Sequence, residues 1–365
     1  MENMGERLKR FYKSKKVLVT GHTGFKGAWL CHVLTNFGAK VTGYALAPEM
    51  QPNLFDLCGL ETRMNSILGD IRDLNCLRDV VETAVPQIVF HMAAQPLVLE
   101  GYSRPHYTYD VNVMGTVNIL ECMRLVSGIE SFVNVTTDKV YLNDESGEAF
   151  SEEDPLDGFD PYSNSKSCAE LVTHSYKNSF FTKAGMPAIS TARAGNVIGG
   201  GDFAQYRILP DCIRAAVEKK DIKVRNPNSI RPYQHVLEPL LAYMHIAQVQ
   251  CENSALAGYY NVGPDAVDSV STGELATLFC KVWGEGLQWD AHAKNAPFES
   301  NYLRLNCTYI KNKLSWRPRW HVDEAVRKTV EWAKVWQAGE DISVEMDKQI
   351  EEYLQTKGEQ EQCLS

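Results

Sequence analysis

The chain has 365 residues, of which 44% are hydrophobic, so it can bury a sizeable core and is not an intrinsically disordered protein. Its formal net charge of -9 excludes nucleic acid as a bulk electrostatic partner, although a local phosphate site is still allowed. The basic residues 9–16 are not followed by an apolar stretch of the length found in signal peptides, and no uncharged apolar stretch is long enough to span a membrane. We therefore expect a soluble, cytoplasmic protein with no membrane partner.

The cysteines are scattered along the chain and form no Cys-x-x-Cys pair. This pattern predicts free thiols in a reducing compartment, with neither disulfides nor a bound metal. The ten positions are Cys31, Cys58, Cys76, Cys122, Cys168, Cys212, Cys251, Cys280, Cys307 and Cys363.

The first elements read as strand, glycine-rich turn and helix. Residues 17–20 form a short apolar run, residues 21–27 read GHTGFKG, and an apolar helical pattern extends from residue 29 to 37 with Gly38 as its C-cap. The first glycine permits a tight turn, the second lets the backbone approach a pyrophosphate, and the third lets the helix pack close to the strand. The amides at the helix start then bind the phosphates. The predicted cofactor-binding residues here are Gly21, Thr23, Gly24, Phe25, Lys26 and Gly27.

The next three strands are expected to supply the other residues that bind the cofactor. Residues 40–44 form a strand that ends without an acid for the ribose hydroxyls, and no arginine stands there for a 2′-phosphate, which favours NAD over NADP. A third strand at residues 66–70 places Asp70 and Ile71 against the adenine. A fourth, at residues 87–94, ends in small residues, so Ala93 lets the cofactor lie over the sheet edge. We interpret His91 as a buried structural histidine.

A helix opens near residues 109–112 and carries Asn112, a poor helix former. The side chain of Asn112 either holds a water or backbone carbonyl beside the cofactor and Lys166, or faces solvent. An apolar strand at residues 131–135 follows, and it leads into the run TTDKVY at residues 136–141.

Strand and helix alternate, which predicts an α/β fold with a Rossmann-type doubly wound parallel sheet and ligands at the carboxyl ends of its strands. The alternation weakens after the run GGGD at residues 199–202. We therefore expect an NAD-binding domain of residues 15–202 plus 234–262, and a smaller, discontinuous nucleotide-sugar-binding domain of residues 203–233 plus 263–350. Arg193 ends a strand on the cofactor side. The candidate substrate ligands are Asn196 and three arginines, Arg207, Arg231 and Arg304, each of which has a solvated surface position as its alternative.

Tyr162 and Lys166 are four residues apart and share one face of a predicted helix. A tyrosine with the ordinary pKa of about 10 is a poor base. A nearby ammonium and the positive charge of the nicotinamide are expected to lower the pKa of Tyr162. Tyr162 can then take a proton from a sugar hydroxyl, while Thr137 hydrogen-bonds the same oxygen.

Together these residues resemble the extended short-chain dehydrogenase/reductase family over roughly residues 16–320. The runs that carry the resemblance cover residues 21–30, 136–141, 160–166, 192–202 and 231–238. Within the family they look like the nucleotide-sugar 4,6-dehydratases that act on CDP-glucose. Asp138 is typical of dehydration, and Lys139 stands where related dehydratases carry Glu.

The resemblance implies a reaction through bound NAD that consumes no external oxidant. Tyr162 deprotonates the C4 hydroxyl, Asp138 protonates the departing C6 hydroxyl, and the hydride taken from C4 returns to C6 to give CDP-4-dehydro-6-deoxyglucose and water. Burial must raise the pKa of Asp138 for this role. Lys139 is either the base at C5 or a group that positions the sugar.

Other readings stay open. The enzyme alternatives are a dTDP-glucose 4,6-dehydratase and a nucleotide-sugar 4-epimerase, and the non-enzyme alternative is a dinucleotide sensor or scaffold. We also expect a homodimer or homotetramer, built on the helices that start near Asn112 and Tyr162. Their apolar positions are Val113, Val117, Leu120, Cys168, Leu171 and Val172.

Overall fold

A computed structural model of the protein describes residues 4–291 and 302–356. Its centre is a seven-stranded sheet in the order β3-β2-β1-β4-β5-β6-β11, with every pair of neighbouring strands parallel. This order confirms the predicted α/β fold class, because the chain winds outwards from β1 in both directions. The strands are β1 (Lys16–Thr20), β2 (Lys40–Ala45), β3 (Asn65–Leu68), β4 (Ile88–His91), β5 (Ser131–Val135), β6 (Ala188–Ala194) and β11 (Tyr259–Val262).

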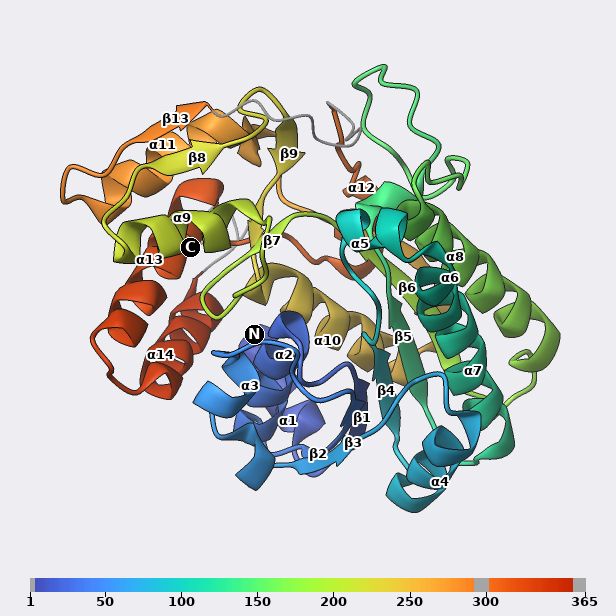
Figure 1. The fold of residues 1–365 in the computed structure, drawn as a ribbon. Helices are drawn as coiled ribbons and strands as arrows, with labels where there is room; N and C mark the ends of the chain where they lie inside the picture. The colour runs from blue at the N-terminus through green and yellow to red at the C-terminus, as the bar shows by residue number, and fades with distance from the viewer. Residues whose placement is uncertain (1–3, 292–301, 357–365) are drawn as a thin grey trace, which may run out of the picture.

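Alternating side chains send the sheet's apolar residues into two separate cores. Val17 and Val19 of β1 belong to one core, whereas Leu18 between them belongs to the other. Helices cover both faces, with α2 and α10 on one side and α7 and α8 on the other (Figure 1). The helices of these two layers are α1 (Met4–Tyr12), α2 (Phe25–Asn36), α10 (Leu237–Glu252), α4 (Leu74–Ala84), α7 (Gly115–Leu125) and α8 (Pro161–Phe180).

The ends of these elements follow the predicted local chemistry. Asp73 caps α4 by accepting hydrogen bonds from the amides of Asn75 and Cys76. Gly38 follows α2 with a φ of +78°, a conformation that glycine adopts without strain. The shorter elements are α3 (Leu54–Leu57), η1 (Leu60–Thr62), α5 (Val98–Ser103), α6 (Pro105–Tyr109), η2 (Asp110–Met114), η3 (Asp138–Val140), η4 (Ser254–Leu256) and η5 (Ala266–Asp268).

A second group of elements gathers beside the sheet, at the upper left of Figure 1. Three two-stranded sheets pair β7 with β10, β9 with β12 and β8 with β13. Their bounds are β7 (Val197–Ile198), β8 (Ile222–Val224), β9 (Ile230–Pro232), β10 (Gln234–His235), β12 (Ser269–Ser271) and β13 (Trp289–Ala291). The helices of this group are α9 (Ile208–Val217), α11 (Thr272–Trp283), α12 (Thr308–Leu314), α13 (Val322–Gln337) and α14 (Ile342–Gln355).

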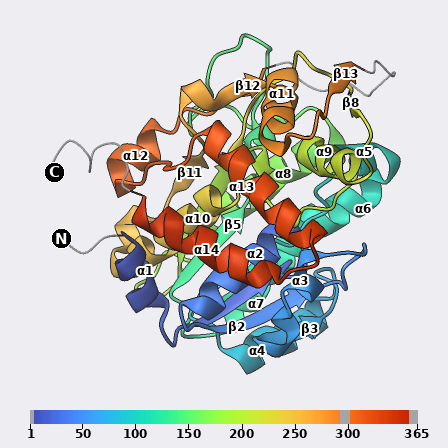
Figure 2. The same ribbon diagram turned by 90° about the vertical axis from the view of Figure 1, so that its left-hand side faces the viewer.

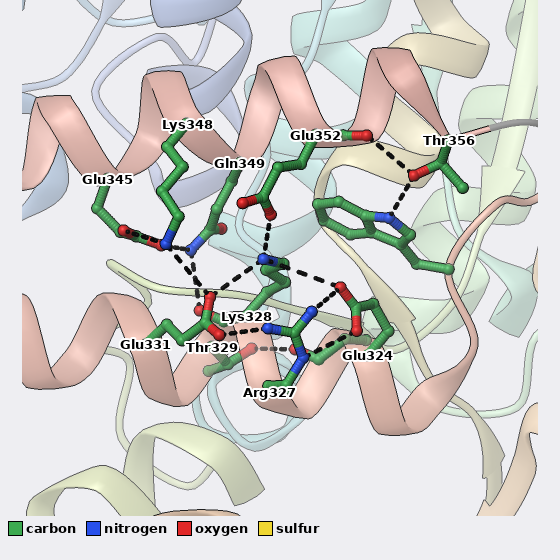
Figure 3. Close-up of polar contacts among 12 residues, drawn as sticks. Glu324, Arg327, Lys328, Thr329, Glu331, Glu345, Lys348, Gln349, Glu352 and Thr356 are labelled. Atoms are coloured by element: carbon green, nitrogen blue, oxygen red, sulfur yellow. Dashed lines mark hydrogen bonds and ion pairs between the residues drawn. The ribbon is translucent and has the colours of Figure 1, made fainter.

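Charged side chains hold α13 against α14 (Figure 3). Lys328 of α13 is only 1% exposed, and its ammonium group pairs with Glu331 at 3.1 Å and with Glu352 of α14. The opposite side of α14 reaches the first helices of the chain, where Asp347 accepts a hydrogen bond from His32 at 2.6 Å. Figure 2 shows α14 crossing in front of α2, close to α1.

The division into two domains, at the boundaries given above, stays a prediction. In its favour, α10 and β11 return to the main sheet after the intervening residues. Against a simple division, α14 falls in the predicted substrate domain and yet packs on α1 and α2. Residues 292–301 of that domain lie outside the described residues.

Three further features bear on the class of protein. None of the helices within residues 4–291 and 302–356 combines the length and apolarity needed to cross a membrane. Over the same residues, His, Cys, Asp and Glu nowhere form a group of three that could hold a metal ion. Every cysteine in that part of the chain is free, and Cys363 lies outside it.

Candidate active site

The glycine-rich turn between β1 and α2 is closely packed at two of its three glycines. A Cβ atom on Gly21, whose φ is +77°, would lie 2.8 Å from the backbone nitrogen of Ala93, and one on Gly27 would lie 2.1 Å from the carbonyl oxygen of Gly21. A Cβ atom on Gly24 would meet nothing closer than 3.5 Å. The fold itself therefore requires Gly21 and Gly27, whereas Gly24 leaves space beside the backbone.

Helix α2 begins with no side-chain cap, since Gly24 is its N-cap residue. The first amides of a helix need partners and carry a partial positive charge, so this end suits the phosphates of a dinucleotide. Thr23 does not compete for these amides, because its hydroxyl donates to the carbonyl oxygen of Leu46 at 2.8 Å.

Asp70 and Ile71, the predicted adenine contacts, lie where β3 ends. The carboxylate of Asp70 is paired with Arg72 at 2.6 Å, and the hydrogen bonds from Arg72 lower the pKa of Asp70. Arg72 also reaches Asp110 at 3.2 Å, and Ile71 packs under the backbone of Gly115. Asp70 is therefore a charged carboxylate held in place by Arg72 just after β3.

The end of β4 is organised around the hydroxyl of Thr20. That hydroxyl accepts hydrogen bonds from the amides of Met92 and Ala93 and contacts Nδ1 of His91 at 2.8 Å. The other ring nitrogen of His91 contacts the hydroxyl of Thr116, and burial lowers the pKa of His91 to about 3. His91 is thus a neutral structural residue, as predicted.

Asn112 lies in η2, a π-helical turn between α6 and α7. Such turns are often found at functional sites. The Asn112 side chain is 1% exposed, accepts from the amide of Gln95 and donates to the carbonyl of Gln95 and to the hydroxyl of Ser165. The solvent-facing alternative is wrong. Asn112 holds a backbone carbonyl, and it ties the loop after β4 to the residue next to Lys166.

Tyr162 and Lys166 come from the start of α8, which Asp160 caps through the amides of Tyr162 and Ser163. The ammonium group of Lys166 donates to the carbonyl of Val135 at 3.2 Å, and burial lowers the pKa of Lys166 to about 8. Burial raises the pKa of Tyr162 to about 12, and a hydrogen bond with Thr137 opposes this rise. The expected lowering of the Tyr162 pKa is not found in the protein alone, since burial outweighs every group that favours the phenolate.

Asp138 follows Thr137 at the end of β5 and is 1% exposed. Its Oδ1 accepts a hydrogen bond from the Thr137 hydroxyl at 3.0 Å, and its Oδ2 has no hydrogen-bond partner among the described residues. Burial raises the pKa of Asp138, although the charges of Lys139 and Arg231 oppose this. The environment therefore favours the protonated acid that the sequence predicts.

Some of the residues described above line a cleft of about 370 Å³, a size typical of small-molecule sites. It brings together residues from the glycine-rich turn, the end of β5, α8 and the second group of elements. The sequence-predicted residues that line it are Phe25, Lys26, Thr137, Asp138, Lys139, Tyr162, Asn196, Arg207 and Arg231.

Lys26 turns its side chain into this cleft. Its ammonium group lies 5.8 Å from the centre of the Tyr243 ring, and burial lowers the pKa of Lys26 to about 7, helped by the charges of Lys166 and Arg207. The sequence predicted only a cofactor contact for Lys26. The structure adds a titratable amine near Asp138.

Two predicted arginine ligands are among the residues that do not line the cleft. Arg193 is 3% exposed and pairs with Glu170 at 2.9 Å, and it also donates to the hydroxyl of Tyr141. Arg304 is half-buried, and its carbonyl accepts from the amide of Phe150. We therefore assign Arg193 to the buried polar network that joins α8 to β6. The other predicted residues outside the lining of the cleft are Gly21, Thr23, Gly24, Gly27, Asp70, Ile71, Ala93, Asn112 and Lys166.

The other three predicted substrate ligands do line the cleft, and the surroundings of each differ. They are Asn196, Arg207 and Arg231. Arg207 pairs with Asp202 at 2.9 Å, and Arg231 is 3% exposed with its guanidinium close enough to Asp138 to lower the pKa of that carboxyl. Asn196 has a φ of +31°, and its buried amide nitrogen has no hydrogen-bond partner in the described part of the chain.

Sequence reasoning missed several residues that shape the cleft. A Cβ atom on Gly195 would lie 1.8 Å from Oδ2 of Asp138, so only glycine fits there. Tyr206 and Arg225 line the cleft together, with the guanidinium 5.3 Å from the ring centre. The rise in arginine and asparagine after residue 202 was a signal for this region, but it did not indicate which side chains would meet.

Comparisons with known proteins place this site in a family. A CDP-glucose 4,6-dehydratase from Salmonella typhimurium is 44% identical over 351 residues, which cover 95% of this chain and 98% of that protein. The human dTDP-D-glucose 4,6-dehydratase is 27% identical, over 87% of this chain and 90% of that protein.

Solved structures show the same fold. The dTDP-glucose 4,6-dehydratase from Bacillus anthracis in complex with NAD aligns with a TM-score of 0.72 at 22% identity, over 90% of this chain and 100% of that one. A UDP-glucose 4-epimerase from Thermus thermophilus, also in complex with NAD, aligns with a TM-score of 0.75 at 22% identity, over 87% of this chain and 98% of that one. Residues 18–329 match the family described as GDP-mannose 4,6 dehydratase. The chain therefore belongs to the GDP-mannose 4,6 dehydratase family.

Proposed function

We propose that this protein is an NAD-dependent hydro-lyase that converts CDP-glucose to CDP-4-dehydro-6-deoxyglucose and water. The observation that carries the proposal is that Thr137, Asp138 and Tyr162 line one cleft, with Asp138 buried and its pKa raised. Lys166 follows Tyr162 by one turn of α8 and is buried behind it. The 44% identity to a protein named CDP-glucose 4,6-dehydratase supports the choice of substrate.

NAD fits the glycine-rich turn on structural grounds. Gly24 leaves space beside the backbone, and α2 begins without a side-chain cap, so its first amides face that space. When bound there, NAD supplies the temporary hydride acceptor that the reaction needs. Gly21, Gly24 and Gly27 would hold its phosphates, and Asp70 and Ile71 would flank the adenine.

The protein's own residues then handle protons. Tyr162 removes the proton from the C4 hydroxyl, and Thr137 orients that oxygen. In the protein alone Tyr162 is a neutral phenol, because burial raises its pKa to about 12. Its action as a base therefore depends on positive charge brought in with the cofactor, together with the ammonium of Lys166.

Asp138 protonates the departing C6 hydroxyl, and burial favours its acid form by raising its pKa. Lys139 lines the same cleft and is half-buried, and it acts either as the base at C5 or as a group that positions the sugar. In the same cleft, Arg207, Arg231 and Asn196 would bind the diphosphate.

We further propose that the protein works in the cytoplasm as a homodimer or homotetramer, joined through α7 and α8. Leu120, one of the residues on which this prediction rested, is fully buried within the protomer and cannot contribute. Met114, Leu125 and Leu171 are exposed by 47%, 55% and 55%, and they give these two helices an apolar outer surface.

The deciding experiment gives purified protein CDP-glucose and NAD⁺ without another oxidant, and follows the alkaline absorbance of the 4-keto product. dTDP-glucose and UDP-glucose run in parallel. We expect product chiefly from CDP-glucose. Product formed chiefly from another nucleotide sugar would support the proposed reaction but contradict the proposed preference for the CDP-linked substrate. Interconversion of CDP-glucose and CDP-galactose without 4-keto product would indicate an epimerase. NAD⁺ binding without any turnover would indicate a sensor or scaffold.

A further inference from the structure

The acid Asp138 lies just beyond the part of β5 that the sheet holds. Backbone pairing of β5 with β6 ends at Val135, and the amide of Thr136 then donates to a carbonyl of β6. Tyr162 comes from a different element, the first turn of α8. Contacts outside the sheet must therefore place the acid relative to this tyrosine.

Side chains of α8 supply such contacts at both ends of the segment 136–140. Oε1 of Glu170 accepts a hydrogen bond from the hydroxyl of Thr136 at 2.5 Å. The hydroxyl of Ser167 donates to the carbonyl of Val140 at 2.7 Å. Both α8 residues and both of their partners are buried, so water competes little for these hydrogen bonds. The two contacts enclose the three residues that lie between their partners.

The carboxylate of Glu170 is itself fixed by β6. Its Oε2 accepts from the hydroxyl of Thr191 at 2.7 Å and from the guanidinium of Arg193 at 2.9 Å. Hydrogen bonds to a charged acceptor are stronger than those between neutral groups. The carboxylate cannot turn away from Thr136 without breaking a buried ion pair, which is costly. Glu170 is therefore a rigid support for the end of β5.

We propose that Glu170 and Ser167 are positioning residues for Asp138. By holding both ends of the segment 136–140, they keep this acid in place relative to Tyr162, which stands on the same helix as they do. The inference rests on the proposed function. Neither positioning residue lines the cleft, so both act through the segment that they hold. A displacement of roughly 1 Å in a reacting group can lower the rate by about 100-fold.

Thr136→Val tests the contact with Glu170. Substitution of Glu170 itself would leave Arg193 as a buried, unpaired charge and would destabilise the fold. Thr191→Val is the matched control, because it removes the other threonine hydroxyl from the same carboxylate, on a residue that does not line the cleft. Thr136→Ser keeps the hydroxyl and should restore activity.

The readout is kcat per NAD⁺-binding site, titrated in the same sample, so that a loss of folded protein does not count as a loss of rate. We expect Thr136→Val to lower this kcat by about tenfold or more. Its KM for CDP-glucose should stay unchanged, because the arginines proposed to bind the diphosphate are untouched. Thr136→Ser and Thr191→Val should change kcat by less than about twofold.

Ser167→Ala tests the other end of the segment, and Thr173→Ala is its control. Thr173 is also a buried hydroxyl residue of α8, but it accepts from the side-chain amide of Asn134, within β5 and ahead of the site. We expect Ser167→Ala to lower kcat per NAD⁺-binding site with KM unchanged. Thr173→Ala should lower the melting temperature and leave this kcat unchanged.

Equal losses of kcat in Thr136→Val and Thr191→Val would overturn the role of Glu170, because the effect would then belong to the whole buried network. For either positioning residue, a loss confined to the melting temperature would show that it only stabilises the fold. Absence of product from CDP-glucose with the unsubstituted protein would overturn the proposed function instead.

Discussion

The carboxyl group of Asp138 depends on Gly195 for the space that it occupies. A Cβ atom at residue 195 would lie 1.8 Å from Oδ2 and 2.4 Å from Cγ, so the whole carboxyl would have to move. We expect Gly195→Ala to lower kcat by about 100-fold, because displacement of a catalytic group by roughly 1 Å has effects of this size.

Gly258→Ala is the control for this substitution, since its Cβ atom would lie 3.5 Å from the Tyr260 ring, an ordinary contact. Both variants are assayed for turnover and for thermal unfolding. Full activity of Gly195→Ala would show that the position of Asp138 is not fixed by this contact.

At the scale of single residues, the sequence predicted which side chains take part in the reaction better than it predicted which side chains they contact. Thr137, Asp138 and Tyr162 do line one cleft, and Lys166 donates to the end of β5, because a strand end and the first turn of a helix are local features. Arg193 looked like a ligand, but it meets Glu170, which is 23 residues earlier on another element and becomes a neighbour only through tertiary packing. The raised pKa of Tyr162 was also missed, because its burial depends on the residues that cover the cleft.

At the scale of elements, a buried carboxyl joins three segments. Oε1 of Glu238, at the start of α10, accepts from the amides of Arg319 and Trp320, and Oε2 accepts from the hydroxyl of Tyr353 on α14. Burial raises the pKa of Glu238 to about 7. The folded chain thus binds this proton more tightly than the unfolded chain does.

This difference makes stability depend on pH with a definite sign. A carboxyl whose pKa is raised on folding contributes most below its unfolded pKa of about 4.3, and that contribution is lost as pH rises through about 7. Glu238→Gln keeps the acceptor oxygen and cannot ionise. We expect its melting temperature, relative to that of the unsubstituted protein, to be several degrees more favourable at pH 8 than at pH 5.

Differential scanning calorimetry at the two pH values checks this expectation. Glu345→Gln, which makes the same charge change on α14 at a carboxylate paired with Lys348, serves as the control. A Glu238→Gln difference that is the same at pH 5 and pH 8 would contradict the assignment.

The contact between α13 and α14 allows a second test at this scale. Lys328→Met keeps an apolar stem against Trp320 but removes the ion pairs with Glu331 and Glu352. Those carboxylates are 29% and 40% exposed, so water can solvate them once the lysine is gone. We expect a loss of about 1–2 kcal/mol in the free energy of unfolding, measured with urea.

Lys348→Met gives the comparison, because this lysine is 51% exposed and also pairs with Glu331 and Glu345. Exposed pairs contribute little, so we expect a change below about 0.5 kcal/mol. Equal losses of unfolding free energy in the two variants would show that the burial of Lys328 does not strengthen its ion pairs.

Elements in the first half of the chain were predicted closely, because each repeats strand, turn and helix with its own apolar pattern. The predicted strand at residues 131–135 coincides with β5, and the helix expected to open at Tyr162 begins one residue earlier. The three small sheets were not predicted. Their strands are two or three residues long and pair across 37 to 67 residues of sequence, so no local pattern marks them.

At the scale of the whole molecule, the exposed apolar surface of α7 and α8 should be an interface between protomers. Leu171 is 55% exposed there, and a charge at that position would have to be buried in a dimer. We expect Leu171→Glu to shift sedimentation at micromolar protein from an oligomer to a monomer.

Val344→Glu is the control, since Val344 is 66% exposed on α14, away from these helices. It should leave the sedimentation coefficient unchanged. An unsubstituted protein that already sediments as a monomer would rule out the proposed assembly.

The contact between α14 and the first helices has a consequence for synthesis on the ribosome. The hydroxyl of Tyr353 and the carboxylate of Asp347 reach Glu238 and His32, and these partners leave the ribosome long before α14 does. Until the last helix emerges, the outer face of α2 stays uncovered in the nascent chain. The first helices of the chain are therefore covered only after α14 has been synthesised. A chain stalled before residue 342 should be a target for chaperones.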